Sequence, residues 1–340
     1  MARADPAHPE ILVVSLDSTG GWRAAARELA ASFERMGAAV RIVGAGPLPR
    51  VRTFALTDFV QAWAARRACG RALAVHDPHA IVYCSVTAAL LWPRPGAIWL
   101  DSIAAENRPG HDGVWQRWFE RRRLRQASMV LAMSERSLDP LGRRHADVVV
   151  IPSPVQRSDA APTEPDAPGA ERDIAAVTYA GDPQKKRLGT ILAAWSQARR
   201  GDEMLVVAGS DRLERRDGVE LAGRLPPEEY RALLRRARVF VAAPRREDYG
   251  IAPLEALADG CMLVTTPAPG PYPALALAQA LDSRLVTEDL AGALRTALDH
   301  PRPGYAERAA ELLRPFSRQA VDRTIAERVL PALVPGWVRA

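Results

Sequence analysis

Two glutamates, Glu247 and Glu255, flank a turn that contains Gly250 and lies between two short apolar runs. Pro253 fits the first turn of a helix, because the N–H that proline lacks has no intrahelical partner there. A helix is therefore expected to begin one or two residues after Gly250. Its free amides and positive dipole end favour an anion, and glycine lets a phosphate approach the backbone closely. Since Glu255 is placed to accept hydrogen bonds from a ribose diol, the stretch predicts a nucleotide site.

The same stretch, from Val239 to Thr266, resembles the retaining group 1 glycosyltransferases. That family carries two glutamates, separated by seven residues, around an aromatic–glycine pair, and here Tyr249 and Gly250 form the pair. The resemblance implies that the first glutamate lies beside the donor sugar, that the backbone after the glycine meets the diphosphate, and that the second glutamate holds the ribose. The donor-site residues expected in this segment are Glu247, Tyr249, Gly250, Ile251, Ala252 and Glu255.

The chain contains only two lysines, Lys185 and Lys186, which follow an apolar strand and Gly181. A compact ammonium suits a diphosphate oxygen. The family has a phosphate-binding lysine after this strand, and counting back from the next helix aligns Lys186 with it, with Lys185 as the alternative. The family commonly places an arginine after the glycine, where this chain has Asp182. Arg187 is therefore the candidate for a second cationic contact.

Three further candidate sites lie on loops that follow predicted strands. Gly223 and Arg224 resemble the loop that binds the nucleobase in the family, although a plain turn is an equal alternative. Gly20 and Gly21 resemble its glycine-rich first loop, which approaches donor phosphate and acceptor; the alternative is a simple turn. Asp101 follows a strand near the position where the family often has a histidine. Its predicted role as general base competes with a role in capping a helix or ordering a loop.

The elements that would position these residues alternate between short apolar strands and helices, which is typical of parallel sheets. The first half has predicted strands at 11–16, 39–43, 81–84, 97–100, 129–132 and 148–151, with helices at 55–74 and 113–126. The second half has predicted strands at 175–179, 204–208, 219–221, 239–242 and 262–265, with helices at 190–199, 227–236 and 252–258. The predicted fold class is α/β, with two Rossmann-like domains facing across a cleft, the GT-B architecture.

The domain boundaries follow from composition. We expect an N-terminal, acceptor-side domain over 1–156, a linker rich in Pro, Ala, Asp and Glu over 157–172, and a C-terminal, nucleotide-sugar-binding domain over 173–316. Residues 317–340 have a helical pattern and are expected to pack back on the first domain. Ligands of such sheets bind at the carboxyl ends of the strands.

Charge and composition limit the remaining choices. The 340 residues carry a formal net charge of +6, which suits a phosphorylated ligand or anionic lipid, and no nucleic-acid motif accompanies it. Apolar runs fall short of the roughly 20 residues of a spanning helix, and the N-terminus lacks a signal core, so we expect a cytoplasmic protein. With no metal-binding cysteine spacing and no Asp-x-Asp motif, we expect no cofactor and no obligatory metal.

The segment 115–125 combines aromatic residues with five arginines on a predicted helix. Membrane-associated members of the family meet anionic lipid through basic, aromatic surfaces of this domain, and the pattern fits an interfacial helix. A solvated helix face is the alternative.

The predicted function is transfer of a hexose-like sugar from a nucleoside diphosphate to an acceptor hydroxyl, with retention of the anomeric configuration. Lys186, Glu247 and Asp101 are the candidate catalytic residues, and catalysis would rest on positioning and on stabilisation of the leaving diphosphate. A nucleotide-sugar epimerase of the same fold and a non-catalytic nucleotide-sugar-binding protein are the alternatives. A nicotinamide dehydrogenase is poorly supported, because Gly44 to Pro49 lacks the third glycine and its prolines prevent the needed helix start.

Overall fold

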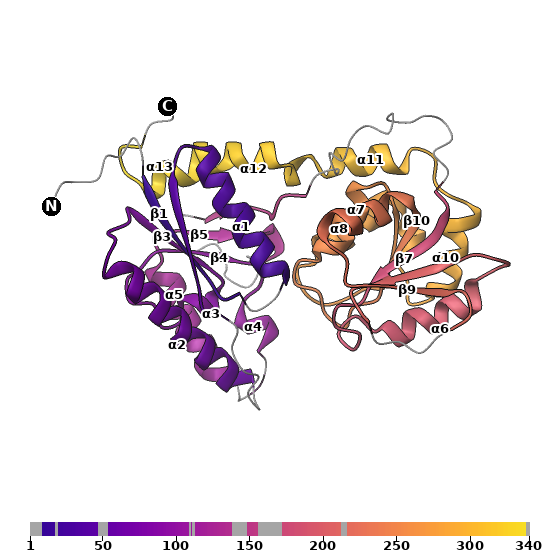
Figure 1. Cartoon of the computed structure of the whole chain (residues 1–340), viewed down its shortest axis with the longest axis horizontal. Helices are drawn as coiled ribbons and strands as arrows, with labels where there is room; N and C mark the ends of the chain where they lie inside the picture. Colours follow the sequence, from indigo (N-terminus) through magenta and orange to yellow (C-terminus); the bar gives the residue numbers. More distant parts are fainter. Residues whose placement is uncertain are drawn as a thin grey trace. The chain divides into compact units, whose positions relative to one another are not determined.

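The computed structural model describes residues 9–17, 20–46, 54–108, 110, 113–137, 148–155, 172–211 and 216–337. The chain divides into two compact units, one formed by Met1–Pro154 with Pro315–Ala340 and the other by Val155–Arg314. In Figure 1 the first unit runs from indigo to magenta and includes the yellow C-terminal helices.

The first unit is built on a six-stranded sheet in the order β2-β1-β3-β4-β5-β6, with every neighbouring pair parallel. The strands are β1 (Glu10–Ser15), β2 (Ala39–Gly44), β3 (Ala80–Cys84), β4 (Ala97–Leu100), β5 (Val130–Ala132) and β6 (Val148–Val150). The helices between them are α1 (Gly20–Arg35), α2 (Phe54–Leu73), α3 (Val86–Ala89), α4 (Ala104–Asn107) and α5 (Val114–Gln126). Continuous apolar strands such as β3 are fully buried, as expected for a parallel sheet covered on both faces.

The C-terminal segment completes this unit. It consists of α12 (Arg318–Thr324), a π-helical turn (Ile325–Val329) and α13 (Leu330–Leu333). The Arg35 guanidinium of α1 donates to Asp322 of α12 at 2.7 Å, and Arg318 donates to Glu28 of α1 at 2.9 Å. Figure 1 shows α12 running beside α1. The inner face of the segment is buried, with Ile325 and Leu330 at 0% exposure, so it belongs to the core of the unit rather than to a tail.

The second unit is built on a five-stranded parallel sheet in the order β11-β10-β7-β8-β9. The strands are β7 (Ile174–Tyr179), β8 (Leu205–Ala208), β9 (Val219–Gly223), β10 (Ala237–Ala242) and β11 (Met262–Thr265). The helices are α6 (Leu188–Ala198), α7 (Pro227–Arg236), α8 (Ile251–Ala258), α9 (Pro273–Asp282), α10 (Leu290–Asp299) and α11 (Tyr305–Leu312). Two parallel, Rossmann-like α/β sheets confirm the predicted fold class.

The strand order of the second unit determines which loops can meet. Because all five strands are parallel, the loops that follow them lie along one edge of the sheet. β10 pairs with β7, and β7 pairs with β8, so the loop after β7 lies between the loops after β10 and β8. The candidate residues after Tyr179, Ala242 and Gly223 are therefore brought to the same edge.

The buried C-terminal segment should stabilise the first unit. Leu330→Ala removes a fully buried side chain and should lower the free energy of unfolding by about 2–5 kcal/mol, measured by urea denaturation. Glu327→Ala, at an exposed position of the same segment, should change it by less than about 0.5 kcal/mol. Equal stability of the two variants would show that the segment does not pack in this core.

Candidate functional site

The centre of the candidate site is a contact between a lysine ammonium in the loop after β7 and a buried carboxylate after β10. Lys186 Nζ donates to Glu247 Oε2. Glu247 is only 9% exposed, so its charge needs a partner, and Lys186 supplies it. Both side chains line a small cavity together with Tyr179, Ala252 and Pro253. The structure thus brings together two residues that are 61 positions apart in the sequence.

The backbone holds the two loops in place. The Arg245 N–H donates to the carbonyl of Lys185 at 3.0 Å, which ties the loop after β10 to the loop after β7. The Glu247 N–H donates to the carbonyl of Pro269 at 3.1 Å. Gly270 has φ +110°, and a Cβ at this position would overlap the carbonyl oxygen of Glu247. Main-chain contacts with the loops after β7 and β11 therefore hold the backbone around Glu247.

Gly250 is required at the start of α8 for two reasons. Its φ of 80° and ψ of 58° lie in the left-handed region that favours glycine. A Cβ there would also lie 2.8 Å from the Tyr272 ring and 3.1 Å from Glu247 Cγ. No side chain caps α8, and Pro253 has no N–H, so the amides of the first turn after Gly250 are left for a ligand. The helix begins at Ile251, one of the two predicted positions.

Sequence reasoning missed the loop between β11 and α9. Tyr272 is fully buried, has φ 24°, and its hydroxyl shares a hydrogen bond of 3.2 Å with Thr265 Oγ1. Its ring covers the Gly250 turn, while Gly270 touches the backbone of Glu247. The signal was present as a dense run of proline and glycine after a buried strand, at 267–273.

Glu255, the predicted ribose ligand, lies on α8 beside a buried ion pair. Burial raises the pKa of Glu255 to about 7; nearby Arg231 lowers it and Asp259 raises it. Arg231 is bound by Asp259 through two hydrogen bonds, one of them 2.9 Å from Nη2 to Oδ1, and the Asp259 side chain is fully buried. Burial also raises the pKa of Tyr230, whose hydroxyl has no hydrogen-bond partner among the described residues. Glu255 thus sits in a poorly solvated part of the site.

The loops after β7, β8 and β9 form a continuous strip. Tyr179, 38% exposed, lies over Gly181 and Gly209, where a Cβ would approach its hydroxyl to 2.8 Å and its ring to 2.7 Å. The Gly209 N–H donates to the carbonyl of Gly223 at 2.6 Å. Arg224 donates its amide to Asp211 Oδ1 at 3.2 Å, and its guanidinium is exposed to solvent. The predicted base-binding loop is therefore adjacent to the loop after β8.

The candidate residues of the first unit lie at the carboxyl ends of β1 and β4. Gly20 and Gly21 are the first residues of α1, and the two residues before them lie outside the described part of the chain. Asp101 accepts a hydrogen bond of 3.3 Å from Ser102 Oγ on its carboxylate and one of 2.5 Å from Ser137 Oγ on its carbonyl. The first amide of α4, at Ala104, is bound by Glu120 of α5. The carbonyl contact supports a loop-ordering role for Asp101.

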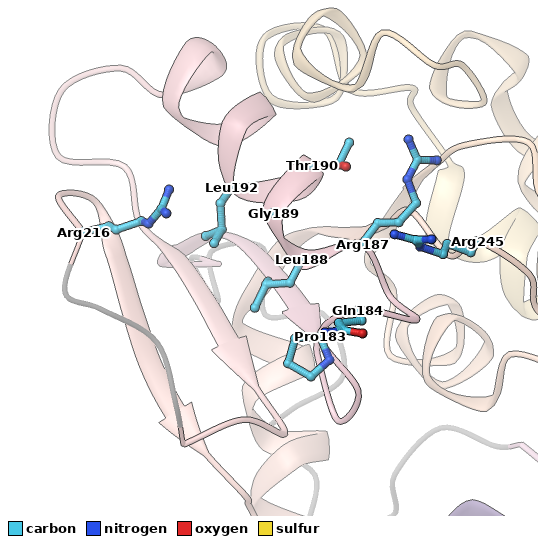
Figure 2. Close-up of a pocket in the computed structure, with 9 residues that line it drawn as sticks. All are labelled: Pro183, Gln184, Arg187, Leu188, Gly189, Thr190, Leu192, Arg216 and Arg245. Carbon is cyan, nitrogen blue, oxygen red and sulfur yellow. The ribbon is translucent and has the colours of Figure 1, made fainter. Parts of the chain in front are cut away.

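Arg187 and Lys185 do not line the small cavity of Lys186 and Glu247. Lys185 is exposed, and Arg187 lines a second pocket beside α6 (Figure 2). Among the described residues, no three His, Cys, Asp or Glu side chains gather in a way that could hold a metal ion.

Comparisons with known proteins give one family match and several similar structures. Residues 172–300, within the second unit, match the family model described as glycosyl transferases group 1. The chain is similar to WaaG, a glycosyltransferase involved in lipopolysaccharide biosynthesis, with 15% identity over 92% of this chain and 99% of that one and a TM-score of 0.67. It is similar to Alr3699/HepE of Anabaena, solved in complex with UDP and glucose, with 16% identity, 94% and 99% coverage and a TM-score of 0.68.

A third structure of this kind is sucrose-phosphate synthase from Thermosynechococcus elongatus, with 19% identity, coverage of 94% of this chain and 97% of that one, and a TM-score of 0.62. The comparison with curated proteins gives no match. At these identities the likeness to solved structures shows the fold, while the sequence match to the family rests on the second unit.

The raised pKa of Glu255 predicts a pH-dependent stability. Between its ordinary pKa near 4.5 and the folded-state pKa of about 7, the folded protein binds more protons at this group than the unfolded chain. The free energy of unfolding should therefore fall through this interval as the pH rises. Glu255→Gln removes the ionisation and should be more stable than the parent at pH 8, with the difference shrinking toward pH 4.5. Urea denaturation at both pH values measures it, and a gap independent of pH would contradict the assignment.

Proposed function

We propose that the chain is a group 1 glycosyltransferase of GT-B fold, which transfers a sugar from a nucleotide-sugar donor with retention, and that Lys186 and Glu247 are the centre of its donor site. The observation that carries the proposal is the contact of these two side chains beside the uncapped start of α8. In the ligand-free protein the ammonium neutralises Glu247. When a diphosphate binds, the ammonium can turn to a phosphate oxygen, since lysine binds as a point charge on a flexible stem.

The proposed chemistry follows from the charges at this edge. Departure of the nucleotide leaves negative charge on the diphosphate, which Lys186 and the amides after Gly250 would stabilise. Glu247, held by its backbone contacts, would lie beside the sugar and stabilise positive charge there. Glu247 and the amides after Gly250 lie on segments held by the backbone, so they need little reorganisation as charge develops.

The remaining donor contacts extend along the same edge. We assign the ribose to Glu255 and the base to the loop of Gly223 and Arg224, with Gly181, Tyr249 and Lys185 as further predicted contacts. Arg187 lines the pocket beside α6 and is not assigned to the donor. Gly20, Gly21 and Asp101 stay predictions for the first unit. Because the similar HepE structure was solved with UDP and glucose, UDP-sugars are the first donors to test.

Substitution of the central pair tests the proposal. Lys186→Ala should weaken UDP binding by roughly 1.5–3 kcal/mol, about ten- to a hundredfold, because a charge-assisted contact is lost. Glu247→Gln should leave UDP affinity undiminished, since it frees the ammonium, but should slow UDP release from UDP-sugars by about a hundredfold or more. Calorimetry and a UDP-release assay measure the two effects.

Lys185→Ala is the matched control, and it should have the smaller effect on affinity. Unchanged UDP affinity in Lys186→Ala would reject the diphosphate assignment. Unchanged turnover in Glu247→Gln would reject its catalytic role. Product analysis after incubation of the donor alone separates a transferase from an epimerase, which would change the sugar without an acceptor.

We also propose that the first unit meets an anionic membrane through a surface formed by α2 and α5. No helix of the described residues is long and apolar enough to cross a membrane. Five large apolar side chains are nevertheless half exposed on these two helices: Leu56, Phe59, Trp63, Val114 and Trp118. We call this set the α2–α5 surface. Transfer of such side chains from water into an apolar environment is favourable.

Aromatic contacts make this surface continuous, and arginines border it. The rings of Phe59 on α2 and Trp115 on α5 are 6.4 Å apart. The Arg67 guanidinium lies 4.6 Å from the Trp63 ring, and that of Arg122 lies 5.8 Å from the Trp118 ring. The opposite face of α5 is buried, with Gln116 and Glu120 inside. An apolar strip bordered by cations suits the headgroup region of an anionic bilayer.

Exchange of the exposed indoles tests the membrane proposal. The Trp63→Ala/Trp118→Ala double variant should bind phosphatidylglycerol-containing vesicles about tenfold or more weakly than the parent, because apolar area available for insertion is lost. Ile42→Ala, at an exposed apolar residue of β2, is the control and should bind like the parent. Vesicle co-sedimentation measures binding. No binding of the parent chain, or equal binding of the double variant, would remove this surface from the proposal.

A further inference from the structure

A second basic pocket lies beside the start of α6. It has a volume of about 710 Å³, within the range of roughly 300–1,000 Å³ that small-molecule sites occupy. Its lining includes three arginines from three segments: Arg187 before α6, Arg216 before β9 and Arg245 after β10. Figure 2 shows Arg187 and Arg245 at one end and Arg216 at the other, with Leu188 and Leu192 between them.

Backbone geometry fixes the arginine-rich end of this pocket. The hydrogen bond from the Arg245 amide to the Lys185 carbonyl holds the two segments together. Arg187 has φ 51° and ψ 45°, a left-handed conformation that is unfavourable for a residue with a side chain. Its carbonyl accepts the Thr190 amide at 2.9 Å, which starts α6. The Arg187 guanidinium is therefore held at a backbone position where glycine would be less strained. It lies next to the Arg245 guanidinium (Figure 2).

Little negative charge offsets these cations. Among the described residues, one ion pair involves an arginine of this pocket, and it joins Arg187 to Glu288 at 3.9 Å. The Glu288 side chain is 66% exposed. An ion pair this exposed to solvent contributes little interaction free energy. The described lining contains no aspartate or glutamate.

The rest of the lining adds hydrogen-bond donors. Gly189 and Thr190 lie in the first turn of α6, where the Leu188 and Thr190 amides already donate to the carbonyls of Pro183 and Arg187. A Cβ at Gly189 would meet nothing within 4 Å, so the backbone there is open to a ligand. Guanidinium groups, the accessible backbone at Gly189 and the Thr190 hydroxyl are donors that recognise phosphate, and the described lining has no competing carboxylate.

We propose that this pocket binds a phosphorylated small molecule of about hexose phosphate size. The phosphate lies between Arg187 and Arg245, and the body of the ligand covers Leu188 and Leu192 toward Arg216. This site is distinct from the Lys186–Glu247 cavity, because the two have different linings. Two sources share this chemistry: a phosphorylated acceptor that receives the sugar, and a phosphorylated effector that binds without reacting.

Glucose 6-phosphate is the probe, and glucose is the matched neutral control. Calorimetric titration with UDP present at saturating concentration should show saturable binding of glucose 6-phosphate and none of glucose. The Arg216→Gln/Arg245→Gln double variant should weaken this binding about tenfold or more, because two charge-assisted contacts are lost. Lys186→Ala should retain it. The Arg308→Gln/Arg314→Gln variant removes the same charge at exposed positions outside the pocket and should also retain it.

Three results would overturn the proposal: no saturable binding, equal binding of glucose, or loss of binding in Lys186→Ala with full binding in Arg216→Gln/Arg245→Gln. The last result would place the phosphate in the donor site. Where the pocket binds the probe, a transfer assay separates the two sources. Glycosylated glucose 6-phosphate identifies an acceptor site, and binding without a new product identifies an effector site.

Discussion

A buried carboxylate at the edge of a parallel sheet sets the requirements for the second unit. Glu247 is removed from water, and an isolated charge there would be costly. Lys186 can neutralise it because β10 pairs directly with β7, which places the two following loops side by side. A different strand order would leave the carboxylate without this partner. The strand order of the sheet therefore determines whether the buried charge of Glu247 has a partner.

Steric fit then determines which residues surround the pair. Gly250, Gly270 and Tyr272 interlock: the tyrosine ring occupies the space that a side chain at Gly250 would need, and Gly270 lies against the backbone of Glu247. The close approach of these three segments leaves the start of α8 uncapped beside the ammonium. The packing of the chain itself therefore holds the start of α8 in the arrangement that an anion requires.

The sequence predicted the strands and the α8 turn because their signals are local. Continuous apolar runs and the position of Pro253 need no knowledge of distant residues. The contact of Tyr272 with Gly250 and the pair of Arg231 with Asp259 depend on how α7, α8 and the loop after β11 pack together, which no local pattern encodes. The family motif assigned a ribose to Glu255 but did not predict which residues surround it. Burial and those neighbouring residues set the pKa of Glu255.

The division of cations between lysine and arginine has a physical reason. Arginine binds a carboxylate through a planar fork with two parallel hydrogen bonds, as Arg231 does with Asp259. Such a pair at Glu247 would resist exchange with an incoming phosphate. Lysine makes a single, flexible contact and can leave one anion for another at small cost. In a chain whose side-chain cations other than Lys185 and Lys186 are arginines and histidines, the lysine at position 186 suits a site whose counter-ion must change during each cycle.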